Sequence, residues 1–282
     1  MAAKPTKEAV EAATKLQGYL DAIAKYEREF KKWEERNKKI LQRYRDEARK
    51  SQGDENSAKF NILWSNVQTL VPATFARLPQ PDVSRRFRDQ DPVGRVAALL
   101  LERGLEFETQ HYPDYRDTMT QCVHDRFLGG RGTAWVRYEP HFKEGAAPQS
   151  EEVQVTEDVE AEAPEEQLDY ECAPVDYVHW KDFGHSVART WEEVTLVWRR
   201  VYMSEAAVEE RFGEEVAKKI PYDSTPEDLR KAERNAGSDV KQQAAIYELW
   251  DKECGEACWF SKSMKEFLDE KPDPLKLQQF FP

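Results

Sequence analysis

The sequence predicts an α+β fold in which long helices pack on mixed or antiparallel sheets. Apolar residues recur at helical spacing through most of the chain before Gly129, which is typical of amphipathic helices. After Gly132 the chain runs directly into alternating, aromatic-rich segments that are typical of strands. Helices that are grouped before the strands, with no internal repeat, indicate the α+β class.

Residues 1–50 predict one long N-terminal helix. Its apolar and aromatic positions advance in steps of three and four over four heptads, as in a coiled-coil seam. Asn37 lies on this seam, where a polar group can fix the register at a cost in stability. Two interpretations stay open: the helix lies on its own domain, or it pairs between subunits. The seam consists of Leu16, Tyr19, Ile23, Tyr26, Phe30, Trp33, Asn37, Ile40 and Tyr44.

Four rings of this seam form a candidate subunit-contact stripe. They present more aromatic surface than a solvated helix should expose. We therefore expect them to be buried against the same or an adjacent subunit, and not in a free two-stranded coil. The stripe consists of Tyr19, Tyr26, Phe30 and Trp33.

The polar sequence at 51–56 breaks the helix and predicts two domains, residues 1–50 and residues 51–282. The second domain opens with a predicted helix at 57–76. Two prolines, Pro79 and Pro81, then predict an extended segment that enters a strand at 82–87.

The stretch 94–138 organises the second domain. Asp91-Pro92 predicts a capped helix start, and Pro113 is expected to kink or divide the long helix. The pair Gly129-Gly130 supplies the left-handed stop that helices favour. A strand follows at 134–138, so the chain turns a glycine corner from helix to strand.

The net charge of −12 comes from a single segment. Twelve acids and no Lys or Arg occur from Glu144 to Trp180, and the rest of the chain carries 42 acids against 42 bases. Residues 144–167 cannot bury enough apolar area to offset their ordering entropy. We expect a solvated, mobile insertion at a hairpin tip, either a spacer or a binding tail. The balanced remainder indicates neither a basic DNA-coating face nor an acidic mimic.

Further elements are predicted toward the C-terminal side. A strand is expected at 194–202, and Ser204 then caps a short helix that ends at Phe212. Thr225-Pro226 is a second helix start, with acids in its first turn. The runs 244–251 and 257–261 predict a hairpin around a turn at Cys254-Gly255-Glu256.

No catalytic, cofactor or metal site is predicted, and we expect a protein that is not an enzyme. The run Gly129–Thr133 lacks the phosphate-loop spacing and follows a helix where a phosphate loop would precede one. Cys254 and Cys258 have a zinc half-site spacing, but no second Cys or His pair follows them. The histidines match no nucleophile motif. They are His111, His124, His141, His179 and His185.

Composition argues against a membrane or secreted protein. No run of 18 apolar residues occurs, so no transmembrane helix is expected. The N-terminus has no apolar signal core. The four cysteines form no evident disulfide framework, which favours a reducing compartment.

The order of elements from Phe60 to Pro282 resembles the N-terminal half of portal proteins of short-tailed, double-stranded DNA phages. Its most telling parts are Val175-Asp176 with Asp182-Phe183, the tryptophan-containing strand and Ser-capped helix after them, and the closing Phe280-Phe281-Pro282. The sequences that carry the resemblance are "FNILWSNVQTLVPATFARLPQPDVSRRF", "TAWVRYEP", "YECAPVDYVHWKDFGHSVARTWEEVTLVWRRVYMSEAAVEERFG", "AIYELWDK" and "DPLKLQQFFP".

The resemblance implies a wing-like domain in a ring of portal subunits, typically twelve, at one vertex of the virion capsid. Such rings assemble in the host cytoplasm and pass double-stranded DNA during packaging and ejection, without sequence specificity. The implied partners are other portal subunits, the terminase large subunit, capsid and scaffolding proteins, and head-completion or tail adaptor proteins. The family's stem, clip and crown would lie beyond Pro282, so the chain resembles a fragment or half of a split gene.

Two other function classes stay open. One is a non-enzymatic adaptor or scaffold that self-associates through the heptad helix. The other is a hydrolase that acts through His and Asp, which requires a pocket where such groups converge.

Overall fold

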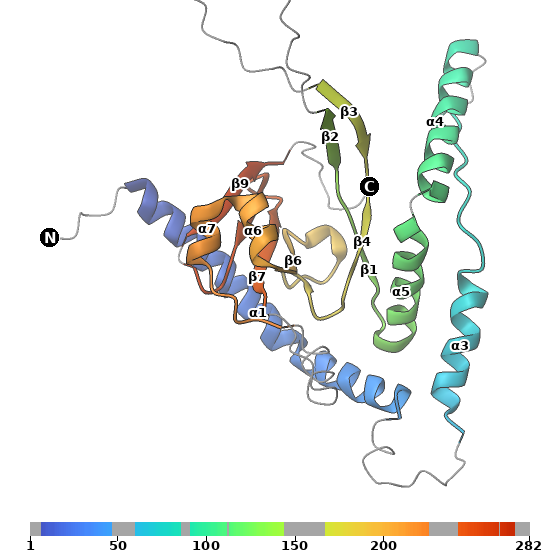
Figure 1. Ribbon diagram of the computed structural model, residues 1–282. Helices are drawn as coiled ribbons and strands as arrows, with labels where there is room; N and C mark the ends of the chain where they lie inside the picture. The colour runs from blue at the N-terminus through green and yellow to red at the C-terminus, as the bar shows by residue number, and fades with distance from the viewer. Residues whose placement is uncertain are drawn as a thin grey trace, which may run out of the picture. The chain divides into compact units, whose positions relative to one another are not determined.

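The protein folds as two compact units, shown in the computed structural model of Figure 1. Unit 1 combines residues 1–55 with residues 178–282, and unit 2 spans residues 56–177. The predicted α+β class and long N-terminal helix are confirmed. The structure describes residues 7–46, 60–85, 91–111, 113–143, 167–225, 242–264 and 266–273.

A five-stranded antiparallel sheet forms the centre of unit 1, and its strand order follows the chain. The predicted strand at 194–202 and the predicted hairpin at 244–251 and 257–261 are confirmed as parts of it. The strands are β5 (Phe183–His185), β6 (Leu196–Met203), β7 (Ala244–Asp251), β8 (Glu256–Phe260) and β9 (Phe267–Pro272), with the 3-10 helix η1 (Trp191–Glu193) before β6.

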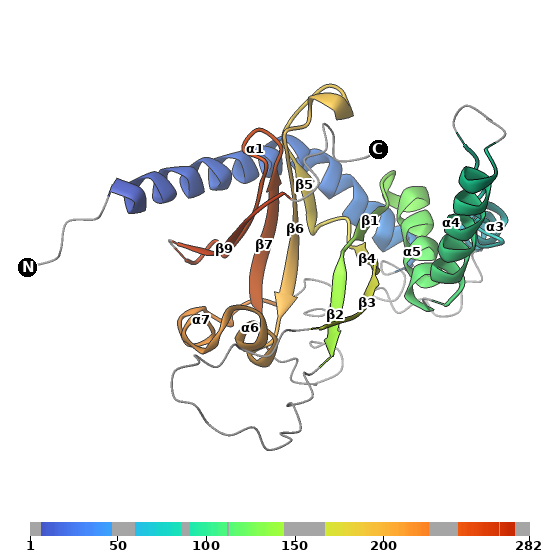
Figure 2. The same cartoon turned by 90° about the horizontal axis from the view of Figure 1, so that it is seen from above.

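The helix α1 (Lys7–Tyr44) crosses one face of this sheet, as Figure 2 shows. Its seam meets the side chains of β6, β7 and β8 that point to the same face. A strand alternates its side chains between two faces, which explains why Tyr247 and Leu249 lie on the α1 side. The shared core contains Leu16, Tyr19, Ile23, Tyr26, Trp198, Tyr247, Leu249, Cys258 and Phe260.

Two short helices, α6 (Glu205–Phe212) and α7 (Glu214–Lys219), cover the opposite face of the sheet (Figure 2). The predicted Ser204 cap is confirmed, because its hydroxyl accepts a hydrogen bond from the Ala207 backbone N–H at 3.4 Å. The second core consists of Val208, Ala217, Ile220, Ala244 and Ile246. With both faces covered, β7 is apolar on both sides, which fits its sequence.

A buried ion pair joins the two central strands. Arg199 of β6 lies directly across from Glu248 of β7, and the guanidinium Nε donates to the carboxylate at 2.7 Å. Both side chains are about 10% exposed. The Trp250 indole N–H donates to the other carboxylate oxygen of Glu248 at 3.0 Å. The buried carboxylate therefore has partners on both oxygens, as a charge in a core requires.

We predict that Glu248→Ala destabilises the protein by about 3 kcal/mol, because it leaves the Arg199 charge buried without its carboxylate. Urea unfolding followed by circular dichroism measures this loss. The matched control is Arg199→Met combined with Glu248→Leu, which removes both charges and should recover much of the stability. Equal losses in the single and double variants would contradict this account.

Three helices build one side of unit 2: α3 (Ile62–Thr74), α4 (Pro92–His111) and α5 (Pro113–Gly129). As predicted, Pro113 divides the long helix, since α4 ends at His111 and α5 begins at the proline. Asn61 caps α3 by accepting a hydrogen bond from the Trp64 backbone N–H at 3.1 Å. α3 packs beside α5 (Figure 1).

The strands of unit 2 form one long hairpin. Its arms pair as β1 with β4 and as β2 with β3, and Arg137, between β1 and β2, bonds Asp176 of β4 through its Nε at 2.6 Å. The Thr118 hydroxyl of α5 donates to the Val175 carbonyl at 3.0 Å and ties the hairpin to the helix. The strands are β1 (Thr133–Val136), β2 (Glu139–Lys143), β3 (Gln167–Cys172) and β4 (Val175–Val178).

The predicted glycine corner joins α5 to β1. Gly130 has φ +85°, the left-handed conformation expected after a helix. At Gly132 the chain lies against α5, so that a Cβ atom there would be 2.0 Å from the Cys122 carbonyl oxygen. A side chain cannot fit in that space without moving the backbone.

We predict that Gly132→Ala destabilises unit 2 by a few kcal/mol, because the added methyl overlaps backbone that cannot rotate away. Gly104→Ala is the matched control, since a Cβ at Gly104 has no neighbour within 4 Å. Thermal unfolding of both variants tests the difference. A melting temperature unchanged by Gly132→Ala would show that the corner is not closely packed.

Two predictions differ from the structure. The chain passes from unit 1 to unit 2 after Glu55, close to the predicted boundary, but residues 51–282 do not form one domain. Residues 178–282 return to unit 1, where they share a core with the α1 seam. Residues 82–85 of the predicted strand 82–87 pair with no strand. Pro79 and Pro81 have no N–H to donate, and the Val83 N–H bonds the Glu102 carboxylate at 3.3 Å.

Several predictions fall outside the described residues. They concern the acidic insertion at 144–167, apart from Gln167 that begins β3, the helix after Thr225, strand residues 86–87, and Phe280–Pro282. These stay predictions.

Candidate functional site

The candidate stripe of α1 packs inside unit 1. Tyr26 lies on Trp198 with ring centroids 5.3 Å apart and stacks on Phe30 at 4.3 Å. Trp33 meets the edge of Trp180 at 5.6 Å. Tyr19 and Tyr26 are buried, whereas Phe30 and Trp33 are half-buried. All four predicted contact residues therefore make ring contacts within unit 1, Tyr19 and Tyr26 more deeply buried than Phe30 and Trp33. An additional intersubunit role stays a prediction.

Tyr19 connects α1 to the turn between β7 and β8. Its hydroxyl donates to Asp251 at 2.9 Å, and the same carboxylate accepts the backbone N–H groups of Glu253 and Cys254 at 2.8 and 3.2 Å. Burial, followed by the bond to Asp251, raises the pKa of Tyr19 above its ordinary value. The interaction positions the helix on the sheet and offers no group for catalysis.

A cluster of cation-binding groups lies beside this contact. Glu256, Cys258 and Glu270 each place one potential ligand atom within 4.8 Å of the others. The Lys15 ammonium binds both carboxylates, at 2.5 and 2.9 Å. Burial lowers the pKa of Lys15, and its bonds to Glu256 and Glu270 raise the pKa by more. The Lys15 charge thus takes the place at which these groups would hold a metal ion.

The two cysteines of the predicted zinc half-site, Cys254 and Cys258, lie in different environments. Cys254 is exposed in the turn, whereas Cys258 is buried in β8. Burial raises the pKa of the Cys258 thiol to about 12 and that of Cys122 in α5 to about 11. Both stay protonated at neutral pH, and metals bind the thiolate.

We predict that iodoacetamide alkylates Cys254 first in the native protein at neutral pH. Cys254 is exposed to the reagent, whereas burial keeps the reagent from the other three thiols. Cys122, Cys172 and Cys258 should react only after denaturation. Mass spectrometry over time measures the order. Early labelling of Cys258 would contradict its place under α1.

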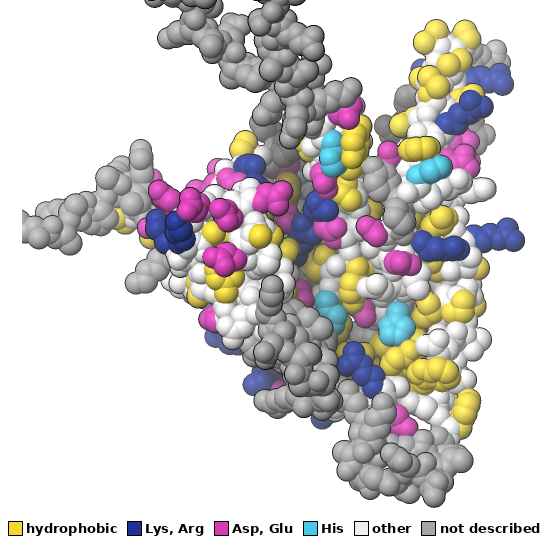
Figure 3. Space-filling model, viewed as in Figure 1, with side chains coloured by type: hydrophobic (Ala, Val, Ile, Leu, Met, Phe, Trp, Pro, Cys, Tyr) yellow, Lys and Arg dark blue, Asp and Glu magenta, His cyan; other side chains and the backbone are white. Residues whose placement is uncertain are grey.

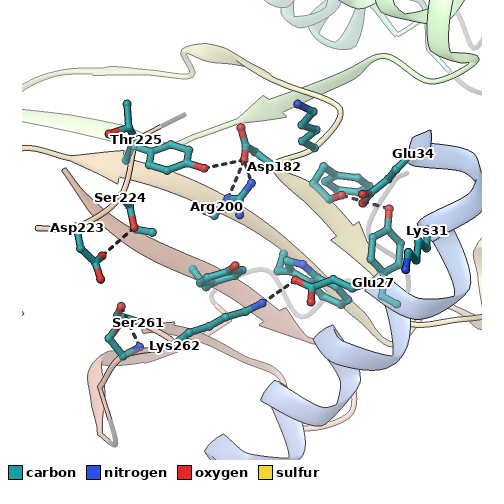
Figure 4. Close-up of a pocket in the computed structure, with 18 of the residues that line it drawn as sticks. Glu27, Lys31, Glu34, Asp182, Arg200, Asp223, Ser224, Thr225, Ser261 and Lys262 are labelled. Atoms are coloured by element: carbon teal, nitrogen blue, oxygen red, sulfur yellow. Dashed lines mark hydrogen bonds and ion pairs between the residues drawn. The ribbon is translucent and has the colours of Figure 1, made fainter. Parts of the chain in front are cut away.

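A cleft of about 650 Å³ lies in unit 1 between the second half of α1 and the sheet (Figure 4). Its charged groups are largely paired: Lys262 bonds Glu27 at 2.6 Å, and Arg200 bonds Asp182 at 2.5 Å. Hydroxyl groups from Ser224, Thr225, Ser261 and Ser263 line the other side.

The cleft does not bring together the groups that the hydrolase interpretation requires. Asp182 and Asp223 line it, but the described lining residues include no histidine and no cysteine. His179 comes within 4.0 Å of Asp182, and Asp182 is already bound by Arg200 and, at 3.5 Å, by the Tyr202 hydroxyl. The arrangement is that of a structural ion pair.

The sequence analysis did not predict one Cys–His contact. On the β2–β3 hairpin, Cys172 Sγ lies 3.7 Å from His141 Nε2. The Glu139 carboxylate approaches the same Nε2 at 3.6 Å, whereas a catalytic triad needs the carboxylate on the other ring nitrogen. His141 also stacks on Tyr170 with centroids 4.1 Å apart. Cross-strand register brings these residues together, and no sequence spacing indicates it.

The most unusual surface of the protein lies on α3 and α4. α4 contains no buried residue, although it carries seven large apolar side chains that are exposed. α3 contains no charged residue, and Val67 is its buried residue. Hydrophobic side chains gather over both helices in Figure 3. The exposed residues are Ile62, Trp64 and Leu70 on α3, and Val93, Val96, Leu99, Leu100, Leu101, Leu105 and Phe107 on α4.

An apolar surface of this kind indicates a binding partner. None of the described helices is long and apolar enough to cross a membrane. Sequence periodicity marked Val93, Val96, Leu100 and Phe107 as a helical stripe, but periodicity alone does not tell whether the chain itself covers such a stripe.

Comparison with known proteins identifies no family: no protein-family model and no curated protein matches the sequence.

Proposed function

We propose that this chain is a structural subunit of a portal ring of a short-tailed, double-stranded DNA phage. The observation that carries the proposal is the order of elements from Phe60 to Pro282, with the telling sequence parts around Val175-Asp176 and Asp182-Phe183. In this proposal the ring occupies one capsid vertex of the virion. DNA passes through it, and the terminase large subunit docks on it.

Three features of the protein support an assembly function. Large apolar faces of α3 and α4 lie uncovered, which suits a subunit that binds other subunits. Outside residues 144–180 the acidic and basic residues are equal in number, and a wall without a basic excess does not retain DNA phosphates. The cleft in unit 1 is lined by paired charges rather than converging catalytic groups.

Asp176 and Asp182, two acids of the segment that carries the resemblance, form ion pairs that agree with a structural role. Asp176 bonds Arg137 and closes the hairpin of unit 2. Asp182 bonds Arg200 in the sheet of unit 1. A segment that carries both acids thus contributes ion pairs to both units, and both acids serve the fold.

An adaptor that self-associates through α1 is the second candidate, and the structure gives it less support. A coiled coil would need the α1 seam as its contact surface. Leu16, Tyr19, Ile23 and Tyr26 of this seam are buried in the core of unit 1. Self-association through α1 would require this core to open.

Electron microscopy of the purified protein tests the portal proposal. We predict that the protein is monomeric or associates weakly at micromolar concentration, and that it closes into rings with rotational symmetry when it is concentrated or extended to the full length of the family. A heterologous contact that closes by rotation gives this result. Dimers or trimers without rings, together with release of α1 from its sheet, would overturn the proposal in favour of the adaptor.

Copurification with a partner protein tests the portal proposal independently. If the gene is expressed with its phage's terminase large subunit, the two proteins should copurify as a complex with a ring. Rings that bind no terminase would leave the assembly function but overturn the portal assignment.

A further inference from the structure

We propose that copies of this chain bind head to tail through unit 2, the α4 stripe of one copy packing on the α3 face of the next. The α4 stripe is Val93, Val96, Leu100 and Phe107, and the α3 face is Ile62, Asn66, Thr69, Leu70 and Ala73. This inference deepens the proposed function, and it rests on that proposal for closure of the ring.

The α4 stripe lies on one side of its helix. Val93, Val96, Leu100 and Phe107 recur at intervals of three, four and seven, which places them on one face. Their exposed fractions are 74, 56, 63 and 58%. Gly104 falls between Leu100 and Phe107, and a Cβ atom added there would have no neighbour within 4 Å. The stripe therefore contains a notch where another helix can approach closely.

The chain covers a different side of α4. The segment before the helix bonds Glu102 through the Val83 N–H. The Arg85 side chain lies over Gly94, where a Cβ would meet it at 2.2 Å. Glu102 and Gly94 lie more than a quarter turn from the stripe by helical spacing. No other described helix or strand packs extensively on α4. The stripe stays exposed because the described residues that contact α4 lie on the side of Glu102 and Gly94.

The α3 face is the surface that fits this stripe. α3 has no charged residue along its 13 residues. Ile62 is 65% and Leu70 45% exposed, and the other residues on the same side, Asn66, Thr69 and Ala73, are uncharged. Val67, which is buried, and Val71 occupy another side of the helix, and α3 packs beside α5. Charged residues are depleted at the centres of interfaces, so an uncharged face of this kind suits the centre of an interface.

The charges around the stripe favour a neutral receiving surface. Arg103 and Glu106 border the stripe on α4. Against an uncharged α3 they stay at the rim in water, which is the usual anatomy of an interface. If two α4 helices paired in parallel, the same charges would face their own kind at close range. The two unlike faces on one unit give a heterologous contact, the kind that forms rings or filaments.

Sedimentation velocity of the full chain over a wide concentration range tests the contact. The wild-type protein should associate. Leu100→Glu on the stripe and Leu70→Glu on the α3 face should each lower the association constant about tenfold or more. Leu105→Glu is the matched control, since Leu105 has the same side chain, is 42% exposed on the same helix and lies five positions after Leu100, on another side of the helix from the stripe. It should associate like the wild type.

Mixing the two variants decides the geometry. The Leu100→Glu chain keeps an intact α3 face, and the Leu70→Glu chain keeps an intact stripe. Together they should form one-to-one complexes that grow no further, although neither associates alone. Failure of the mixture to associate would overturn the head-to-tail contact in favour of pairing between identical faces.

Two further outcomes overturn the inference. One is a wild-type protein that stays monomeric at all concentrations while both variants lower its melting temperature, which would mean that its own chain covers the stripe. The other is equal association of all variants.

Head-to-tail complexes without closed rings in micrographs would keep this contact and overturn the portal proposal. Closed rings that persist in both variants would overturn this contact and keep the portal proposal.

Discussion

The packing of α1 on the sheet of unit 1 is the interaction on which the rest of the structure depends. It joins the helix at residues 7–44 to strands more than 130 residues later in the chain. Tyr26 provides the centre, in contact with Trp198 and Phe30. Burying one such ring is worth roughly 2 kcal/mol. The long helix is stable because of this tertiary contact, since amphipathic helices in water gain most of their stability from packing.

In the proposed assembly, α1 serves the folding of its own unit and leaves the contacts between subunits to other helices. The heptad seam, which in isolation resembles an oligomerisation helix, is occupied by the core of its own unit. Unit 2 has the opposite character, because its helices α3 and α4 leave large apolar side chains in water. A chain with one closed unit and one open unit can fold by itself and still need neighbours to complete its surface.

Local signals in the sequence predicted much of the fold. The 3,4 spacing of the seam, Pro113, Gly130 and the Ser204 cap each act within a few residues, and each is found where it was expected. The return of residues 178–282 to the unit of α1 was not predictable, because α1 and the strands it covers are distant in sequence. The neighbourhood of His141 and Cys172 was missed for the same reason, since it arises from cross-strand register. The open stripe of α4 was visible as a periodicity, but its exposure depends on what the rest of the chain covers.

Hydrogen–deuterium exchange of the dilute and the associated protein tests the division between folding and assembly most directly. The account predicts that α1 amides are equally protected in both states, because its seam is already buried within the chain. Protection should increase on association in α3 and α4, whose apolar faces become covered. An increase confined to α1, with α3 and α4 unchanged, would contradict the account.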